Sequence, residues 1–215
     1  MISDARRVLV VHGLFMTGAE TVLLRRRLRA QGFEPIVFRY SSRHASLDSL
    51  LAVLARGIAD LGEPFHAVGH SLGGVLLLRL LERYPALPLP RCVLLGAPAR
   101  GSAAARRLAQ SRLGARILGP LAIAELARER PAVSPAAAQL GVIAGTRSVG
   151  LGRLVTDLPR PNDGAVAVAE TVVEGAADRI ELPVSHTGML LSPAVAREAA
   201  RFLLQGRFGH PGDHG

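Results

Sequence analysis

The stretch from Ala67 to Leu81, AVGHSLGGVLLLRLL, places the polar pair His70 and Ser71 between glycines, where an apolar strand meets an apolar helix. Three structures fit such a site: a strained turn that carries a nucleophile, a phosphate-binding turn, or a tight turn with a capping serine. The five residues GHSLG at 69–73 match G-x-S-x-G, which in a strand–turn–helix context exposes a reactive serine hydroxyl. This motif favours a nucleophile at Ser71.

The phosphate-binding alternative requires residues that this chain lacks. A P-loop needs G-x-x-x-x-G-K-[ST], and the chain contains no lysine. A dinucleotide-binding turn needs G-x-G-x-x-G after the first strand, which VHGLFMTG at 11–18 does not supply. The choice is therefore between a nucleophile and a capping serine. Gly69 and Gly73 favour the nucleophile, since side chains at these positions would collide at a sharp turn.

Strand-like and helix-like patterns alternate along the chain. Apolar, strand-like runs are predicted at 6–13, 33–40, 65–70, 91–98, 140–146 and 179–184. Helices are predicted at 18–31, 47–61, 71–84 and 193–205. This alternation predicts an α/β fold with an about six-stranded, mainly parallel sheet and helices on both faces.

One domain is predicted over 1–215, because no linker divides the chain. The Ala-, Arg- and Leu-rich segment 101–138 is longer than one crossover helix needs, so it predicts a small helical cap after the fourth strand. The Gly- and His-rich segment 206–215 predicts a flexible tail and is a weak candidate for a metal site.

The composition limits the class of protein. Hydrophobic residues make up 49% of the chain, which permits a sizeable core, and the single Cys92 excludes an internal disulfide. The N-terminus has no secretory signal pattern, and no apolar run is long enough to span a membrane, so the expected location is the cytoplasm. The net charge of +9 reflects either codon bias towards arginine or attraction to an anionic membrane surface. Nucleic-acid binding is not expected, because recognition motifs are missing and aromatic residues are few.

A serine nucleophile needs a histidine base, and two histidines lie at the carboxyl ends of predicted strands, where open α/β sheets bind ligands. These are His12 and His186. In the order nucleophile, acid, histidine, the base belongs after the last strand, which selects His186. His70 adjoins Ser71 but points elsewhere at such a turn, so a structural role is predicted. The remaining histidines lie in a loop, at a strand start and in the tail: His44, His66, His210 and His214.

The acid should lie in the chain between Ser71 and His186, after a late strand. Asp163, in PRPNDGAVAV, lies in a predicted tight loop after the strand at 140–146 and is the first candidate. Asp157 is the nearest competitor, whereas Asp178 lies too close to the start of the last strand. The stretch LGAPARGS at 95–102 contains no carboxylate.

Two backbone N–H groups are predicted to hold an oxyanion. The Leu72 N–H follows the nucleophile at a helix N-terminus. The His12–Gly13 pair lets the backbone approach the nucleophile turn, so that the Leu14 N–H can be the second donor. His12 itself is predicted to shape its loop by hydrogen bonding.

Five stretches in this order, VVHGLF, VGHSLGG, LGAPARGS, NDGAV and SHTGMLLSP, resemble the α/β-hydrolase superfamily and look most like its small bacterial lipase and esterase branch. The resemblance covers about 7–204 and implies a compact α/β-hydrolase fold. It also implies Ser71 as nucleophile, Asp163 as acid and His186 as base, with Leu14 and Leu72 as oxyanion donors. Ala97 and Ala99 depart from the GTPHRGS pattern of those lipases.

The expected activity is hydrolysis of carboxylic esters, of acyl or lipid type, through an acyl-enzyme, with no metal or organic cofactor. The expected partners are a small-molecule or lipid ester and an anionic membrane surface. Thioester hydrolysis or acyl transfer on the same three residues is the nearest alternative, because function depends on the cavity rather than on the fold. A non-catalytic protein that binds an acyl ligand or a partner protein is the alternative of a different class.

Overall fold

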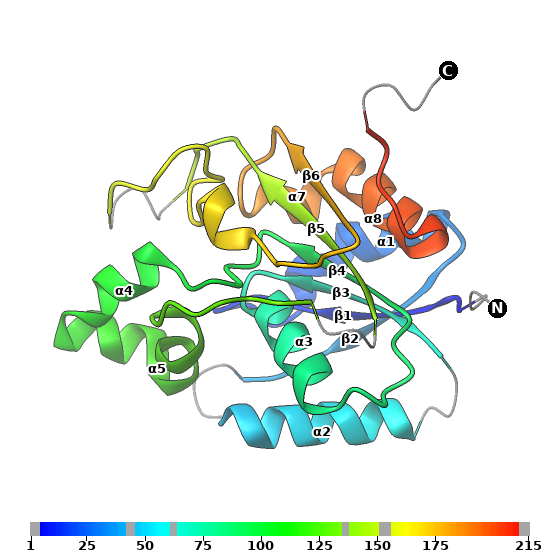
Figure 1. Ribbon diagram of the computed structural model, residues 1–215, viewed down its shortest axis with the longest axis horizontal. Helices are drawn as coiled ribbons and strands as arrows, with labels where there is room; N and C mark the ends of the chain where they lie inside the picture. Colours follow the sequence, from blue (N-terminus) through cyan, green and yellow to red (C-terminus); the bar gives the residue numbers. More distant parts are fainter. Residues whose placement is uncertain (1–4, 42–45, 61–63, 135–137, 151–155, 211–215) are drawn as a thin grey trace.

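The computed structural model describes residues 5–41, 46–60, 64–134, 138–150 and 156–210. Its centre is a six-stranded sheet in the order β2-β1-β3-β4-β5-β6, and every neighbouring pair is parallel (Figure 1). The strands are β1 (Arg7–Val11), β2 (Glu34–Phe38), β3 (His66–His70), β4 (Arg91–Leu95), β5 (Gln139–Gly145) and β6 (Asp178–Leu182). All six lie inside the predicted strand-like runs or overlap them closely, so the predicted sheet is confirmed.

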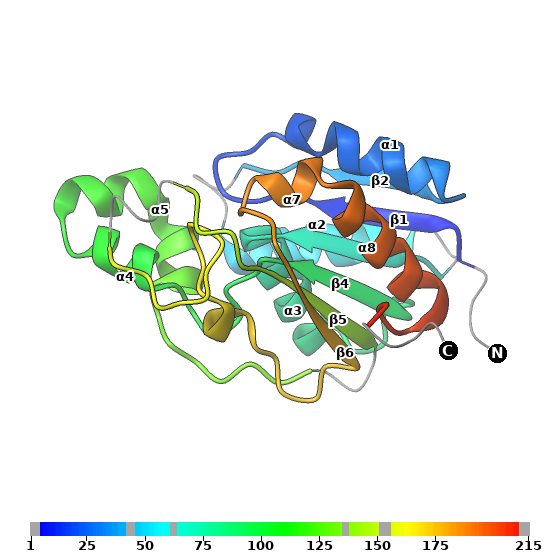
Figure 2. The ribbon, with the colours of Figure 1, turned by 90° about the horizontal axis from the view of Figure 1, so that it is seen from above.

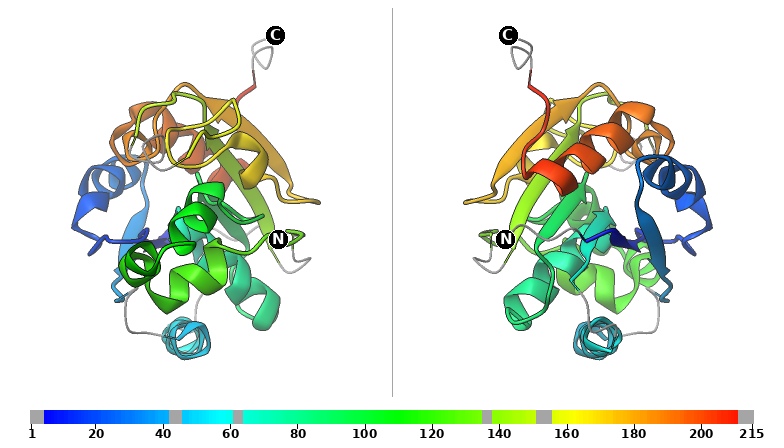
Figure 3. Two further views of the ribbon diagram at one scale, coloured as in Figure 1. Left: turned by 90° about the vertical axis from the view of Figure 1, so that its left-hand side faces the viewer. Right: turned by 90° about the vertical axis from the view of Figure 1, so that its right-hand side faces the viewer.

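Helices cover both faces of the sheet. They are α1 (Val22–Ala30), α2 (Leu47–Ala59), α3 (Leu72–Arg83), α4 (Ala103–Ala109), α5 (Arg112–Leu126), α7 (Gly188–Leu191) and α8 (Pro193–Gln205), with short 3-10 turns η1 (Ala19–Thr21) and η2 (Val168–Thr171). In Figure 3 the helices α1 and α8 lie on one side of the sheet, and α2 and α3 lie on the other. The sequence did not predict η2 or α7, because elements of about one turn leave no helical periodicity.

Alternate side chains of each strand enter two separate cores, as the period of a β-strand requires. Leu9 and Val11 of β1 pack in the core under α2 and α3. Val8 and Val10 of the same strand pack in the core under α1 and α8. Because both faces are buried, the strands are apolar throughout, which is why they stand out in the sequence.

The strand order has a switch point between β1 and β3. From β1 the chain first moves outward to β2, and then β3 is added on the opposite side of β1. At such a point the loops at the carboxyl ends of the two central strands separate and leave a crevice, which is where open α/β sheets bind their ligands. Ser71 follows β3 and His12 follows β1, so both predicted loops meet there.

Helices α4 and α5 project beyond the carboxyl edge of the sheet (Figure 2). They occupy the centre of the predicted cap 101–138, of which 135–137 lie outside the described residues. Gly119 has non-helical angles (φ 76°, ψ 165°) and precedes Pro120, so α5 consists of two short helices that meet at a kink. Ser102 and Ser111 cap the two helices with their hydroxyl groups.

The C-terminal segment corrects part of the predicted flexible tail 206–215. Phe208 is fully buried and contacts Phe202 of α8, with ring centroids 4.9 Å apart. Asp178 accepts a hydrogen bond of 2.6 Å from the Phe208 N–H. Residues up to His210 therefore pack on the body, because one aromatic side chain outweighs the polar composition around it, while 211–215 lie outside the described residues. Within the described part of the chain, no helix is long and apolar enough to cross a membrane.

Candidate active site

Ser71 lies at a strained turn between β3 and α3. Its backbone has φ 54° and ψ −123°, and among described non-glycine residues only Phe15 shares a positive φ. Such angles cost free energy and persist only where the surroundings hold them. Here a Cβ atom at Gly73 would overlap the carbonyl oxygens of Val11 and His12, so glycine allows the start of α3 to lie against the end of β1.

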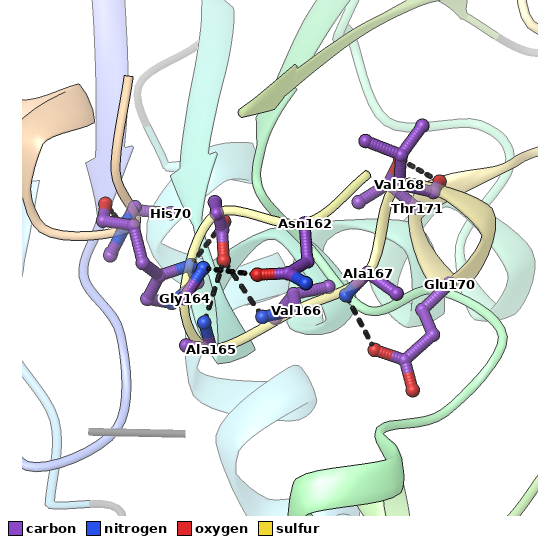
Figure 4. A network of polar contacts seen from close by, with 11 residues as sticks. His70, Asn162, Gly164, Ala165, Val166, Ala167, Val168, Glu170 and Thr171 are labelled. Atoms are coloured by element: carbon purple, nitrogen blue, oxygen red, sulfur yellow. Dashed lines mark hydrogen bonds and ion pairs between the residues drawn. The ribbon is translucent and has the colours of Figure 1, made fainter. Parts of the chain in front are cut away.

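Asp163 is held in a tight turn between β5 and β6, and its side chain is 1% exposed. One carboxylate oxygen, Oδ1, accepts hydrogen bonds from the Ala165 N–H (2.9 Å) and the Val166 N–H (2.7 Å). The other oxygen, Oδ2, lies 2.7 Å from His186 Nδ1. Figure 4 shows Gly164, Ala165 and Val166 on this turn. Three donors thus satisfy a buried carboxylate, as burial of a charge requires.

The structure brings Ser71 and His186 to the same cavity, and Asp163 supports His186 from behind. Because a carboxylate only accepts hydrogen bonds, His186 Nδ1 carries the proton of this pair and Nε2 is the free nitrogen. The imidazole side chain is 15% exposed, which leaves it accessible from the cavity. This is the arrangement of a base whose tautomer is set by an acid.

His70 supports the histidine loop rather than the serine. Its Nε2 lies 3.0 Å from the His186 carbonyl oxygen, and its ring lies beside the His186 ring with centroids 4.7 Å apart. Burial, followed by the charge of the neighbouring His186, lowers the pKa of His70 to about 3, so the ring is neutral. A carbonyl only accepts, so Nε2 donates and the buried Nδ1 has no partner among the described residues.

His12 orients the peptide that carries the Leu14 N–H. His12 Nδ1 donates to the Gly13 carbonyl oxygen at 3.0 Å, and the ring stacks on Tyr40 at 4.4 Å. In a trans peptide the N–H points away from the C=O, so binding the Gly13 carbonyl directs the Leu14 N–H. In the described part of the chain, neither the Leu14 N–H nor the Leu72 N–H donates to a protein acceptor.

A cavity of about 460 Å³ is lined by Leu14, Ser71 and His186, among other residues. Its walls come from the β1 and β3 turns, the segment before α4, both cap helices, and the loops at 149–150, 165–166 and 186–187. The apolar lining residues include Leu14, Phe15, Met16, Pro98, Leu108, Leu118, Leu126, Val149 and Val166. Leu118 and Leu126 are buried, whereas Phe15 and Val149 are more than half exposed, so the cap forms the deep wall and these two residues lie at the mouth.

The competing residues lie elsewhere. Asp157 is exposed and makes no hydrogen bond to His186. Asp178 binds the C-terminal segment through the Phe208 N–H and His210. Gly96 follows β4, in the stretch at 95–102 that contains no carboxylate. A Cβ atom at this position would lie only 3.0 Å from Asp163 Oδ2, so the glycine makes room for the Asp163 carboxylate.

Among the other candidates, His66 is buried at the start of β3, and burial followed by the charge of Arg91 lowers its pKa to about 4. Cys92 is buried in β4, and burial raises the pKa of its thiol to about 12. His44 and His214 lie outside the described residues. No group of three His, Cys, Asp or Glu side chains that could hold a metal occurs in the described ranges.

Two further residues support the acid turn: Asn162, which suits the tight loop predicted around Asp163, and Glu170, which sequence reasoning missed. Asn162 accepts from the Gly164 N–H (3.0 Å) and donates to the Pro159 carbonyl (3.1 Å). Glu170 accepts from the Ala167 N–H (2.8 Å; Figure 4) and also from the Ala103 N–H (2.5 Å) at the start of α4. Through these two hydrogen bonds Glu170 connects the acid turn to the cap. Its burial raises the pKa of its carboxyl group. The position of Glu170 in the sequence, eight residues before Asp178, does not indicate its contact with the start of α4.

A second hollow, of about 610 Å³, is lined in part by Ala103 and Ala167. Arg100, Arg106 and Arg130 line it together with Glu129 and Glu170. Arg106 pairs with Glu129 at 2.8 Å, and Arg130 pairs with the buried Glu125 at 3.1 Å. This hollow is larger than the first but contains neither the serine nor the two histidines, so it is a separate feature.

The sequence matches the model of the alpha/beta hydrolase family over 8–212. Among solved structures, phospholipase PlaB from Legionella pneumophila aligns with a TM-score of 0.70 and 17% identity, over 94% of this chain and 60% of that chain. The lipase BlEst2 from Bacillus licheniformis, in its propeptide form, aligns with a TM-score of 0.71 and 16% identity, over 86% of this chain and 47% of that one. Naproxen esterase from Bacillus subtilis aligns with a TM-score of 0.56 and 14% identity, over 93% of this chain and 84% of that chain.

At these identities the structural likeness concerns the fold. The chain spans only 60% and 47% of the lengths of the first two structures. No protein with a curated description matches the sequence significantly.

Proposed function

We propose that this chain, which belongs to the alpha/beta hydrolase family, hydrolyses carboxylic esters through an acyl-enzyme intermediate on Ser71. The observation that carries the proposal is the 2.7 Å hydrogen bond between Asp163 Oδ2 and His186 Nδ1, in a cavity that the strained Ser71 also lines. This combination supports a nucleophile, its base and the acid that orients the base. A capping serine needs neither a histidine nor a carboxylate behind it.

In the proposed first half-reaction, His186 Nε2 takes the proton of Ser71 Oγ as this oxygen attacks the ester carbonyl carbon. The tetrahedral intermediate collapses when the carbon–oxygen bond to the alcohol breaks, and His186 gives its proton to that leaving alcohol. In the second half-reaction His186 takes a proton from water as the water oxygen attacks the acyl carbonyl carbon. The bond between this carbon and Ser71 Oγ then breaks, His186 returns the proton to Ser71 Oγ, and the carboxylic acid is released. Asp163 stays ionised throughout and stabilises the imidazolium.

The proposed oxyanion donors are the N–H groups of Leu14 and Leu72. Leu72 is the first residue of α3, so its amide has no partner within the helix and lies at the positive end of the helix dipole. The contact between His12 and the Gly13 carbonyl supports a fixed direction for the Leu14 amide before substrate arrives. Removing one such donor typically costs about 3 kcal/mol of the activation free energy.

The proposed substrates are esters with an apolar acyl part. The support is the lining of the cavity, which is dominated by Leu, Val, Ala, Pro and Met side chains around the few reactive groups. The similar structures are described as a phospholipase, a lipase and an esterase, and at 14–17% identity they add support of the same kind without naming a substrate.

A fluorophosphonate probe tests the nucleophile. We expect it to label the wild type and not Ser71→Ala, and we expect hydrolysis of a p-nitrophenyl ester to fall by at least about 10⁴-fold. Ser102→Ala is the matched control, because Ser102 lines the same cavity but caps α4, and this variant should still be labelled. Equal labelling of Ser71→Ala would remove Ser71 as the nucleophile.

The acid is tested by Asp163→Asn and Asp157→Asn. The first change presents an amide to His186 Nδ1 and should lower kcat by roughly 10³- to 10⁴-fold. The second change is at an exposed position and should leave kcat within a factor of two or so. The opposite result would assign the acid to Asp157.

The ester class is tested with a series of p-nitrophenyl esters of increasing acyl length, alongside acyl-CoA thioesters. A rising kcat/KM with acyl length supports an acyl or lipid ester substrate. A strong preference for acyl-CoA would instead identify a thioesterase on the same residues.

A further inference from the structure

Helix α5 exposes an outer face on which arginines and large aliphatic side chains alternate. This outer face consists of Arg112, Leu113, Arg116 and Ile117, and all four are exposed. Leu113 is 70% exposed, the highest fraction for any large hydrophobic residue in the described ranges, and Ile117 is 40% exposed. Residues four apart lie above one another on a helix, so the face has one aliphatic row beside one arginine row.

The outer face is not needed for packing the cap. The buried residues of α5 that pack in the main core cluster are Leu118, Leu121, Ala122 and Leu126. Arg112, Leu113, Arg116 and Ile117 are exposed instead, and no ion pair within the described ranges involves Arg112 or Arg116. Its aliphatic carbons and its two guanidinium groups are therefore available to an external partner.

The charge on the two cap helices is mostly positive. Residues 103–126 contain four arginines, at 106, 107, 112 and 116, and a single acidic residue, Glu125. Glu125 is buried and pairs with Arg79 at 3.2 Å and Arg130 at 3.1 Å, so it does not offset the outer arginines. The cap pair thus presents net positive charge together with apolar side chains.

The position of the face links it to the cavity. Figures 1 and 2 show α4 and α5 as the part of the molecule that projects beyond the carboxyl edge of the sheet. Leu108 of α4 and Leu118 of α5 line the cavity that contains Ser71. Phe15 and Val149, at the mouth, are 57% and 59% exposed. A surface that held the outer face of α5 would therefore lie at the same end of the molecule as the cavity.

We propose that the outer face of α5 docks this protein on an anionic lipid bilayer, so that esters within the bilayer reach the cavity beside it. Helices that lie in a bilayer interface combine aliphatic side chains, which enter the acyl boundary, with basic side chains that bind lipid phosphates. Arginine suits this role, because its guanidinium group binds phosphate oxygens in pairs. The docking surface rests on the proposed function for its purpose, but its test does not depend on activity.

The test is co-sedimentation of the full chain with vesicles of phosphatidylcholine, with and without one third phosphatidylglycerol. We expect binding to the phosphatidylglycerol vesicles, weak binding to phosphatidylcholine alone, and loss of binding at about 1 M NaCl, where the Debye length is about 3 Å. The double change Arg112→Glu with Arg116→Glu should weaken binding by at least about 25-fold, since each basic residue near the surface contributes roughly fivefold. Leu113→Asp with Ile117→Asp should also weaken it.

The matched control is Val53→Asp with Arg56→Glu on α2, which exposes an aliphatic residue and an arginine but does not line the cavity. This control should bind vesicles as the wild type does. Hydrolysis of a soluble ester without vesicles should be equal in all variants, so a failed nucleophile test and a failed docking test remain distinct.

Three results would overturn the docking proposal. They are an absence of binding to any vesicle, equal binding to neutral and anionic vesicles, and equal losses in the α5 variants and the α2 control. Sedimentation velocity gives a fourth: a dimer that Leu113→Asp dissociates would assign the face to a second copy of this chain.

Discussion

Strands β1 and β3 lie side by side, but the histidines at their carboxyl ends make different contacts. The buried His12 follows β1 and the buried His70 is the last residue of β3. Each of the two turns also contains a non-glycine residue at positive φ, Phe15 at 60° and Ser71 at 54°. His12 binds the carbonyl of the next residue, whereas His70 binds the carbonyl of His186, which lies 116 residues further along the chain. The same side chain at the same place in the fold therefore acts locally at one strand and over a long range at its neighbour.

The largest expected effect comes from separating the two strand ends. Gly73→Ala places a Cβ atom on the carbonyl oxygens of Val11 and His12, so α3 must move away from β1. We expect a loss of about 3 kcal/mol or more in the free energy of unfolding, measured in urea, and loss of ester hydrolysis. Gly57→Ala is the control, because a Cβ atom there meets nothing within 4 Å. This change should raise the free energy of unfolding by about 0.5–1 kcal/mol, since alanine favours a helix more than glycine does. If Gly73→Ala left the free energy of unfolding and the activity unchanged, the close approach of the two turns would be contradicted.

The two histidines can be separated by a double-mutant cycle. His70→Phe leaves the His186 carbonyl unpaired and disturbs the base, while His12→Phe releases the peptide of the Leu14 N–H. Each should lower kcat by roughly 10- to 100-fold, which corresponds to about 1–3 kcal/mol for a lost buried hydrogen bond. In an Asp163→Asn background the base is already disabled, so His70→Phe should add little and His12→Phe should keep its full effect. Full effects of both changes in that background would refute the division of roles.

The change in the free energy of unfolding with pH should reveal that His70 is buried in its neutral form. Its pKa in the folded protein, about 3, lies below the ordinary value of 6.5, so the fold favours the neutral ring. Its contribution is fully present above pH 6.5 and is lost as the pH falls towards 3, because only the unfolded chain then takes up the proton. The slope for one such residue is up to about 1.4 kcal/mol per pH unit.

The measurement is the free energy of unfolding in urea between pH 7 and pH 4 or so. His70→Phe should give a shallower decline than the wild type. His66, with a pKa lowered to about 4, should keep part of the decline in that variant. An unchanged slope in His70→Phe would mean that the ring is protonated in the folded state.

The smallest effect concerns the strain at the two turns. Phe15→Asn and Ser71→Gly each replace a residue at positive φ by one that accepts it more easily, and each should raise the free energy of unfolding by up to about 1 kcal/mol. Only Ser71→Gly should abolish ester hydrolysis. If neither variant gains stability, the surroundings relax around the turns without stored strain.

Much of the fold was predictable because buried parallel strands are apolar on both faces. The runs around β1, β3 and β4 are recognisable for this reason, and the Ser46 cap of α2 has a local signal, since its hydroxyl accepts from the Ser49 N–H. The elements η2 and α7 were missed, as was the packing of Phe208, because short turns and single buried aromatics leave no periodic pattern.

By itself the sequence determined the order of strands and helices and the turn at Ser71. It also reduced the candidates for the acid and the base to a few residues, with Asp163 and His186 first among them. These depend on local patterns: the period of apolar residues, glycines around a turn, and polar residues after strands. Only the tertiary structure decided that the Asp163 carboxylate meets His186 and that Asp157 does not. It also decided the contact of His70 with His186 and that of Glu170 with α4. Contacts between residues far apart in the chain depend on how strands align in the sheet, and no local pattern records that alignment.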